Sequence, residues 1–479
     1  MSYQVPQHID KNKVFIVSRS EIEGRLEPEF YRPSLASLEK QIRRQSSHKL
    51  RDYALYLAGG ATPKKTEAEK FYSDSESGIP FLRVQNLQTD GELSLDDCVY
   101  INKETHNGLL ARSQVAEGDL LVKITGVGRM AVASVAPQGF VGNTNQHMVV
   151  IKTGDPELSK YLARYLNLDI VEKVASRHST GGTRPALDYP SLKNIPVIEG
   201  VDFSKIDEAI SSKKQKENES QQLIDSIDSY LLEELDVVLP EIKTDLKSRQ
   251  FIINRSSLEG RLDPSVYKDG IKLVSEKYNN VKLSNCAWIN PNTSFKGKDA
   301  ETPISFIPME VIDECYSEIT SMSEKTIDDS SGFTRFQNGD LLWAKITPCM
   351  QNGKSVVARD LTNGLGCGST EFFIIRPRTC QLSIDYLQAL LHMKAIRETA
   401  MLYFGGSAGQ QRVSVNFLEN FNVPLPPIEK QEEIAHHIAV LRQKAKALQQ
   451  EGRLQLEKAK QEVEQMIIGR DNINRNETL

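Results

Sequence analysis

One six-residue motif, Glu23-Gly24-Arg25-Leu26-Glu27-Pro28, returns later in the chain as Glu259-Gly260-Arg261-Leu262-Asp263-Pro264. Two further pairs keep the same order, Gly118-Asp119-Leu120-Leu121 with Gly339-Asp340-Leu341-Leu342, and Gly181-Gly182-Thr183-Arg184 with Gly405-Gly406-Ser407. Chance matches would not stay collinear over three pairs, and self-similarity at a long period indicates a repeated structural unit. The sequence therefore predicts two homologous halves, roughly residues 14–236 and 250–470.

Both halves share one internal plan, a globular part followed by a long helix. Short apolar runs bounded by Gly, Asn and Asp predict strands, and longer periodic segments predict helices. The expected strands are Ile79–Val84, Leu120–Thr125, His147–Lys152 and Glu371–Arg376, and the expected helices are Leu158–Ser176 and Ile384–Tyr403. We expect an α+β fold with two mixed α/β domains at 14–200 and 248–425, a first long helix and linker at 201–247, and a second long helix at 426–468.

The second long helix carries the clearer pattern. Pro424-Leu425-Pro426-Pro427 gives a stiff lead-in, and proline is favoured at the first position of a helix. Ile434, Leu441 and Leu448 then fall seven residues apart, with Ile438 four after the first of them. This heptad spacing is typical of a coiled-coil seam, so these four residues are predicted to pair with the helix of the first half. A solvated charged helix is the alternative.

Composition bounds the function. The chain has 479 residues, and its net charge of −5 opposes a simple nucleic-acid binder, although local basic patches can occur in an acidic chain. The six cysteines never occur at C-x-x-C spacing, so neither a zinc site nor a disulfide framework is expected. Because no apolar run is as long as a membrane span and no signal peptide is recognisable, we expect a cytoplasmic protein without a membrane partner.

Catalytic motifs are missing from the sequence. It contains no phosphate-binding loop, no dinucleotide loop and no Asn-Pro-Pro-Tyr tetrapeptide of the kind that adenine methyltransferases use. Two tethered copies of one domain without a catalytic cluster favour a binding protein that engages two half-sites. Asp119 with Lys123, and Asp340 with Lys345, leave open a self-contained, duplicated metal-dependent DNA nuclease, although a second carboxylate beside each lysine is missing. A scaffold that binds only proteins is a third possibility.

A resemblance to a known family covers the chain from about Val14 to Ile468. The segment Asn422-Val423-Pro424-Leu425-Pro426-Pro427-Ile428-Glu429-Lys430-Gln431-Glu432-Glu433-Ile434 resembles the start of the long helix in specificity subunits of type I restriction-modification systems. Gly368-Ser369-Thr370-Glu371-Phe372-Phe373 is similar to a Ser-Thr-Glu strand of that family, in which the Gly-Asp-Leu-Leu turns also occur. The first half departs from the pattern, with Asn194-Ile195-Pro196-Val197-Ile198 in place of the double proline and Asn145-Gln146-His147 in place of Ser-Thr-Glu.

The resemblance implies a mechanism. Each globular part would be a target recognition domain that reads one half of a bipartite site in double-stranded DNA. The two long helices would pair antiparallel, set the gap between the half-sites and carry two adenine methyltransferase subunits, with an ATP-dependent restriction and translocase subunit joining for cleavage. The chain itself would be non-catalytic and bind no cofactor, since S-adenosylmethionine, ATP and Mg²⁺ would be held by the partners. Because the two halves diverge outside the shared motifs, we expect an asymmetric site.

The candidate DNA-contacting residues are Arg, Lys, Asn and Gln on elements expected to protrude, because these side chains reach base edges and phosphates. In the first half they are Lys64, Lys65, Arg83, Gln85, Asn86, Lys123, Arg129, Asn145, Arg177 and Arg184. In the second half they are Lys296, Lys298, Arg335, Lys345, Asn352, Lys354, Gln410, Gln411 and Arg412.

Two glycine-rich loops are the most persuasive groups among these candidates. They are His178–Arg184 and Gly405–Arg412, where glycine permits a close approach of the backbone to phosphates. For any single candidate, a solvated surface charge is the alternative. Arg25 and Arg261 of the repeated motif are instead expected to be structural, as salt-bridged residues at the entry to each domain. No metal-ligating or catalytic residues are predicted.

Overall fold

The computed structural model describes residues 6, 9–240, 252–255, 263–268, 270–407 and 410–476, without the side chains of Lys65 and of residues 470–476. The second copy of the repeated motif, with Arg261, lies largely outside these residues. The chain forms two compact units, the first from residues up to 215 together with residues from 451 on, and the second from residues 216–450. Among the described residues, no helix is long and apolar enough to cross a membrane.

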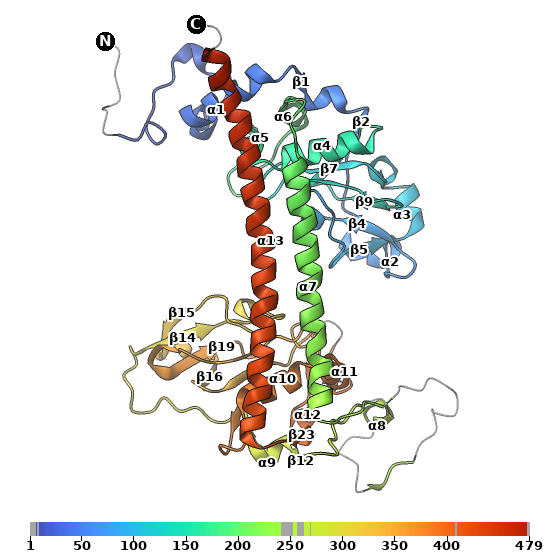
Figure 1. The fold of residues 1–479 in the computed structure, drawn as a ribbon, viewed down its shortest axis with the longest axis vertical. Helices are drawn as coiled ribbons and strands as arrows, with labels where there is room; N and C mark the ends of the chain where they lie inside the picture. The colour runs from blue at the N-terminus through green and yellow to red at the C-terminus, as the bar shows by residue number, and fades with distance from the viewer. Residues whose placement is uncertain are drawn as a thin grey trace. The chain divides into compact units, whose positions relative to one another are not determined.

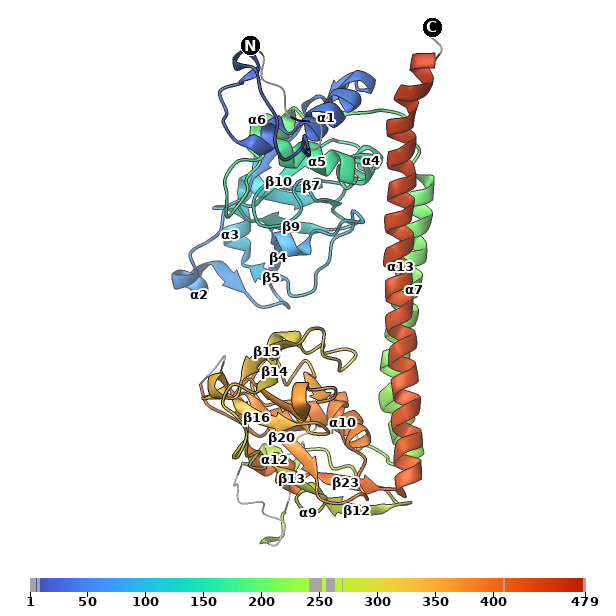
Figure 2. The same ribbon diagram turned by 90° about the vertical axis from the view of Figure 1, so that its left-hand side faces the viewer.

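The first unit contains two main sheets. One is antiparallel with the order β2-β10-β7-β8, and the other has the order β3-β5-β4-β9-β6, in which β4 and β9 are parallel. The strands are β1 His48–Lys49, β2 Tyr56–Gly59, β3 Tyr72–Ser73, β4 Ile79–Leu82, β5 Val99–Ile101, β6 Gln114–Ala116, β7 Leu120–Lys123, β8 Ala133–Val135, β9 Val141–Thr144, β10 Met148–Lys152 and β11 Pro196–Val197. The helices are α1 Pro33–Gln45, α2 Ala68–Phe71, α3 Lys103–Asn107, α4 Pro156–Leu166, α5 Asp169–His178 and α6 Tyr189–Lys193. Figure 2 shows α4 and α5 on one side of β7 and β10, and β4, β5 and β9 on the other.

The second unit repeats this topology, except that β3 has no counterpart in the mixed sheet of the second unit. Its antiparallel sheet has the order β13-β20-β17-β18, and its mixed sheet has the order β15-β14-β19-β16, again with a parallel pair, β14 and β19. The strands are β12 Asn279–Lys282, β13 Ala287–Ile289, β14 Pro303–Ile307, β15 Ser323–Thr326, β16 Thr334–Gln337, β17 Leu341–Ala344, β18 Ser355–Val357, β19 Leu365–Gly368, β20 Phe372–Pro377, β21 Phe404–Gly405, β22 Arg412–Val413 and β23 Asn422–Leu425. The helices are α8 Pro264–Lys268, α9 Leu283–Cys286, α10 Ile384–His392, α11 Lys394–Met401 and α12 Val415–Asn420. The mixed α/β architecture and the repeat predicted from three short motifs thus hold for the strand order of both sheets.

The central strands are covered on both faces. Successive side chains of a strand point to opposite sides of the sheet. In β7, Leu120 belongs to the apolar cluster under α4 and α5, and Leu121 belongs to the cluster between the two sheets. In β17, Leu341 and Leu342 are divided between two clusters in the same way. This double burial is why the strands are continuous apolar runs in the sequence, and the four predicted strands are confirmed as β4, β7, β10 and β20 to within two residues at each end.

The helix predicted from Leu158 to Ser176 is wrong as a single element, because the structure divides it into α4 and α5. Asn167, between the two, accepts the N–H of Ala133 at 3.2 Å and donates its side-chain amide to the carbonyl of Ala133 at 2.7 Å. Ala133 begins the edge strand β8, so Asn167 satisfies backbone groups that the sheet leaves unpaired. These tertiary hydrogen bonds outweigh helix continuity.

The helix predicted from Ile384 to Tyr403 is also divided, into α10 and α11. Met393 between them is non-helical, with φ −52° and ψ 136°, and the N–H of Lys394 donates to the Asp228 carboxylate at 2.9 Å. Asp228 belongs to the long helix α7 (Ser204–Glu234), so a distant acidic residue caps the start of α11. Burial raises the pKa of Asp228, and the N–H of Lys394 opposes that rise.

The two long helices, α7 and α13 (Ile428–Asn476), each contribute one end to each unit (Figure 1). Within each unit their residue numbers run in opposite directions along the contact, so the helices are antiparallel there. The contacting pairs are Lys205 with Glu462 and Ser212 with Gln455 in the first unit, and Tyr230 with His437 and Glu234 with Lys430 in the second.

The four predicted seam residues of α13 are buried to different degrees. Ile434 and Ile438 are 0% and 2% exposed in the main apolar core of the second unit, whereas Leu441 and Leu448 are half-buried. The helix therefore packs on the globular part of the second unit as well as on α7.

The C-terminal part of α13 belongs to the core of the first unit. Leu456, Val463 and Ile467 pack in the cluster that holds α4 and α5. Glu464 accepts the backbone N–H of Asp169 and of Ile170 at the start of α5, which supplies the cap that this helix lacks locally. Burial raises the pKa of Glu464, and these N–H groups favour its ionised form.

Gly452 lies at a close approach of α13 to α7 in the first unit, since an added Cβ would lie 3.1 Å from the Lys213 Cα. We predict that Gly452→Leu destabilises the first unit by about 1–3 kcal/mol, because overpacking forces the helices apart. The measurement is amide hydrogen exchange of α4 and α5 in the full chain. Gly469→Ala, in open space on the same helix, is the control, expected to be neutral or stabilising. Equal protection in both variants would contradict the close packing.

Candidate nucleic-acid interface

The Gly-Asp turns have the same structural role in both units. Gly118 and Gly339 adopt positive φ angles of 77° and 85°, which the turn before each central strand requires. The Asp119 carboxylate accepts the N–H of Ala116 at 2.8 Å and the amine of Lys152 at 2.9 Å. Asp119 thus fixes the turn before β7 and forms an ion pair with a cation of the neighbouring strand β10.

In the second unit, Asp340 makes contacts that correspond to those of Asp119, and its side chain is fully buried, with the residue 0% exposed. It accepts the Gln337 N–H at 2.8 Å, and the Nε and Nη2 groups of Arg376 donate to its two oxygens at 2.6 and 2.7 Å. Arg376 also donates to the Thr293 hydroxyl at 2.8 Å, which ties the loop 290–296 to the sheet. The described residues contain no group of three or more His, Cys, Asp or Glu able to hold a metal ion.

The two lysines equated in the sequence are not structurally equivalent. Lys123 pairs with Met148 in the sheet, whereas Ala344 holds the matching position opposite Phe372, so Lys345 lies one residue further along. A shift of one residue in a strand moves a side chain to the other face. Lys123 is 5% exposed and donates to the Val127 carbonyl at 2.7 Å, and burial lowers its pKa. The extra residue between Asp340 and Lys345 was the signal in the sequence for this difference.

A loop cluster forms at the same end of the antiparallel sheet in each unit. In the first unit it comprises residues 60–65, 124–129, 143–147 and 180–187. Ile124 is central to it, because its N–H donates to the His147 carbonyl at 2.9 Å and its carbonyl accepts the Leu187 N–H at 2.8 Å. Gly60 packs directly on the Thr144 backbone, where a Cβ would come within 1.8 Å of the carbonyl oxygen.

The second loop cluster comprises residues 290–296, 345–348, 369–371 and 410–413, and Lys345 takes the place of Ile124. Its N–H donates to the Glu371 carbonyl at 2.9 Å, and its carbonyl accepts the Val413 N–H at 2.9 Å. The Arg412 guanidinium binds the Glu371 carboxylate at 2.8 and 2.9 Å. Arg412 lowers the pKa of Glu371, and Glu371 raises that of Arg412.

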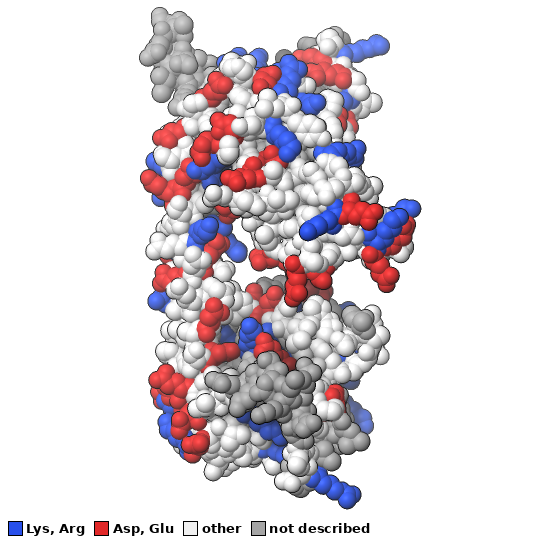
Figure 3. All heavy atoms as spheres, turned by 90° about the vertical axis from the view of Figure 1, so that its right-hand side faces the viewer, with Lys and Arg blue, Asp and Glu red and all other residues white. Residues whose placement is uncertain are grey.

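A hollow of about 560 Å³ opens within the second loop cluster. Its lining holds three cations, Lys296, Arg335 and Lys345, three phenylalanines, several Asn, Ser and Thr residues, and no carboxylate. Four other hollows in the described part of the chain all contain acidic residues. Figure 3 shows Lys and Arg interspersed with Asp and Glu over the face that it draws. The lining of the hollow is therefore positively charged, whereas the face drawn in Figure 3 carries both signs of charge.

The structure brings together only some of the candidate residues. Lys296, Arg335 and Lys345 line the hollow, and Gln410, Gln411 and Arg412 lie in the same loop cluster. Lys298 is exposed nearby, and Asn352 bonds Glu314. Lys354 donates to two backbone carbonyls, those of Met309 and Ile312.

The candidates of the first half are more dispersed. Lys64, Gln85 and Arg184 are exposed, and the side chain of Lys65 is outside the described residues. The others are held by the fold: Arg83 by the Asp97 carbonyl, Asn86 by the Ser94 carbonyl, Lys123 by the Val127 carbonyl, Arg129 by Asp169, Asn145 by the His147 N–H, and Arg177 by Glu39.

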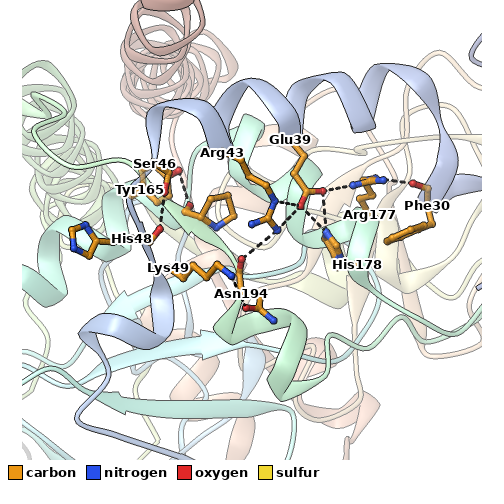
Figure 4. Close-up of polar contacts among 11 residues, drawn as sticks. Phe30, Glu39, Arg43, Ser46, His48, Lys49, Tyr165, Arg177, His178 and Asn194 are labelled. Atoms are coloured by element: carbon orange, nitrogen blue, oxygen red, sulfur yellow. Dashed lines mark hydrogen bonds and ion pairs between the residues drawn. The ribbon is translucent and has the colours of Figure 1, made fainter. Parts of the chain in front are cut away.

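A buried carboxylate that the sequence did not single out organises the base of the glycine-rich loop in the first unit. Figure 4 shows Arg43, Arg177 and His178 converging on Glu39 of α1. Burial by itself raises the pKa of Glu39. The hydrogen bonds and charges of these three partners outweigh burial and lower the pKa from 4.5 to about 2. The loop 179–186 begins directly after His178.

Arg25 of the repeated motif joins the same arrangement. Its guanidinium lies 4.6 Å from the Phe30 ring centre and donates to the Ser179 carbonyl at 2.8 Å. It also pairs with Glu27 at 3.3 Å. The motif therefore fastens the N-terminal segment to the start of the loop, which supports the structural role expected for Arg25.

We predict that Glu39→Gln lowers the stability of the first unit by about 3 kcal/mol at neutral pH, since the lowered pKa stabilises the folded state. That contribution is present above the ordinary carboxyl value of 4.5 and is lost as the pH falls towards 2. The difference from wild type, followed by hydrogen exchange of α5, should shrink in this acid range. Glu29→Gln, an exposed pair with Arg32, is the control. A difference independent of pH would refute the ionic role.

We predict that Asp340→Asn destabilises the second unit by about 3 kcal/mol or more, because it leaves a largely buried guanidinium without its charge partner. Both tryptophans of the chain, Trp288 and Trp343, belong to this unit, so urea unfolding followed by tryptophan fluorescence reports on it selectively. Asp385→Asn removes the exposed pair with Arg359 and should cost no more than about 1 kcal/mol. Similar shifts of the two midpoints would contradict the assignment.

Part of the chain is similar to known proteins. Residues 276–458 match the family model described as Type I restriction modification DNA specificity domain. The specificity subunits of the type I restriction enzymes EcoEI and EcoAI of Escherichia coli are 34% identical over 190 residues and 36% identical over 188 residues. Each match covers 39% of this chain and 31% of the relative, so the chain spans about a third of the length of these curated relatives.

Among solved structures, a chain from a study of complex assembly and conformational transition of the type I R-M system is 16% identical, with a TM-score of 0.42. The match covers 88% of this chain and 95% of that chain, and at this similarity it supports no conclusion about function. The matched segment 276–458 contains the whole hollow lined by Lys296, Arg335 and Lys345. As the sequence resemblance predicted, residues 276–458 are similar to the DNA specificity domain of type I restriction-modification systems.

Proposed function

We propose that this chain is the DNA-specificity subunit of a type I restriction-modification complex. The observation that carries the proposal is the hollow of the second loop cluster, which lies inside the segment matched by the DNA specificity domain. Lysines in such a hollow neutralise phosphates, and amide, hydroxyl and guanidinium groups reach base edges. The missing carboxylates matter because an acidic side chain here would repel the DNA backbone.

The site is proposed to be bipartite and asymmetric. The two units share one strand order and present loop clusters at the same end of the equivalent sheets. Equivalent positions carry different chemistry, since Ile124 and His147 of the first unit correspond to Lys345 and Glu371 of the second. Two readers of one topology with different contact residues are expected to select different half-sites.

We further propose the domain boundaries, the pairing of the long helices and the partner subunits. The domain boundaries that we propose are those expected from the sequence, with α7 and α13 between two recognition domains. The helices would form an antiparallel coiled coil that sets the gap between the half-sites and docks two adenine methyltransferase subunits and an ATP-dependent restriction subunit. The chain would act in the cytoplasm, catalyse nothing and bind no cofactor, with S-adenosylmethionine, ATP and Mg²⁺ on its partners. The two E. coli relatives, named as specificity subunits, support this role.

The test begins by defining the DNA site through methylome sequencing of cells that carry the complete system. We predict that the double change Lys296→Ala/Lys345→Ala weakens binding of the full complex to that site and reduces the slope of log affinity against log salt by up to about 2, one for each lost phosphate contact. Arg359→Ala, which removes a cation from a different hollow, should leave the slope unchanged.

Tryptophan fluorescence checks that each variant retains a folded second unit. An unchanged slope in the double variant would exclude the hollow as a phosphate-binding surface. Cleavage of DNA by the purified chain with Mg²⁺ alone would favour the nuclease, and a chain that binds its partners but never DNA would favour the protein scaffold.

A further inference from the structure

We propose that Arg335 reads a guanine in the half-site recognised by the second unit. This inference rests on the proposed function and names one specificity-determining residue within it.

Arg335 is held in place from two sides. It lies in β16, where its backbone pairs with the buried Cys367 of β19, so the base of the side chain is fixed by the sheet. Its guanidinium carbon lies 4.7 Å from the centre of the Phe295 ring, and Phe295 is itself only 4% exposed. Stacking on an immobile ring orients the guanidinium plane before any ligand arrives, which lowers the entropy lost on binding.

The donors of Arg335 are available within the hollow. No hydrogen bond or ion pair of its guanidinium occurs among the described residues, and no carboxylate lines the hollow. Other arginines of the same unit have carboxylate partners. Arg359 binds Asp385, Arg376 binds Asp340, and Arg412 binds Glu371. Arg335 thus combines a fixed position with unused hydrogen-bond donors, whereas these neighbours use theirs to hold the fold.

The base that fits is guanine. The guanidinium offers two parallel N–H donors, and guanine presents two adjacent acceptors, O6 and N7, in the major groove. Adenine places an amino donor beside its N7, so a second guanidinium donor would meet another donor. Lys296 and Lys345 in the same lining are strongly hydrated point charges without this fork, and they suit phosphates instead.

The experiment compares the methylomes of cells carrying wild type, Arg335→Ala, Arg335→Lys and Lys345→Ala chains in the complete system. Arg335→Ala should relax one guanine of one half-site, with discrimination at that position falling on the order of tenfold or more. The spacer and the other half-site should stay the same. Arg335→Lys keeps the charge but not the fork, so it should relax the same guanine, whereas a phosphate contact would be rescued by lysine. Lys345→Ala should lower methylation at the site without changing the motif.

The outcomes separate this inference from the proposed function. If deletion of the chain leaves every methylated motif in place, the proposed function fails. If the motif depends on the chain but both Arg335 variants keep it unchanged, or if lysine restores full specificity, the role of Arg335 as a guanine reader is overturned. A motif without guanine in either half-site overturns it as well. If Arg335→Ala does not accumulate as a folded protein, the lysine variant alone decides between base and phosphate.

Discussion

The fold of each unit depends on the hydrogen bonds of one buried carboxylate at the start of its central strand, Asp119 in the first unit and Asp340 in the second. Asp340 accepts two donors from Arg376 and one from the turn of Gln337, so it fixes where β17 begins. In a strand covered on both faces, the starting point decides which side chains enter which core and which reach the loop end. Through Arg376, the same carboxylate holds Thr293 and with it one wall of the hollow. One ion pair therefore fixes both the start of β17 and one wall of the hollow.

Much of the fold could be predicted from the sequence, because the signals for many strands and helices lie within single segments of the chain. Apolar runs buried on both faces, glycine turns and a proline at the start of a helix predicted β7, β10, β20 and α13 close to their observed positions. The broken helices were not predictable in the same way. The break between α4 and α5 is stabilised by hydrogen bonds of the Asn167 side chain with the backbone of Ala133. The break before α11 is stabilised by Asp228 from another helix. Periodicity within one segment carries no information about such distant partners.

The candidate site was predicted less well, for a related reason. The sequence lists basic and amide side chains but does not reveal which already have partners. Arg129 and Arg177 look like DNA contacts in the sequence, and the structure engages them with Asp169 and Glu39. The hollow could not be predicted, because its lining combines residues of β16 and β20 with loop residues that are distant in the sequence, and none of these lining residues is acidic. The net charge of −5 is compatible with the proposed DNA binding, because phosphates respond to local charge more than to net charge.

The discontinuity of the first unit bears on the order in which the protein is made. Its core takes Leu456, Val463 and Ile467 from α13, and Glu464 caps α5, yet these residues leave the ribosome long after the rest of the unit. Until they arrive, the apolar side of α4 and α5 has no complete cover, so the unit that is translated first is finished last. A nascent chain that stops before residue 451 would expose this surface to chaperones and proteases. Folding of the first unit therefore requires synthesis of the chain through Ile467, the last of these core residues.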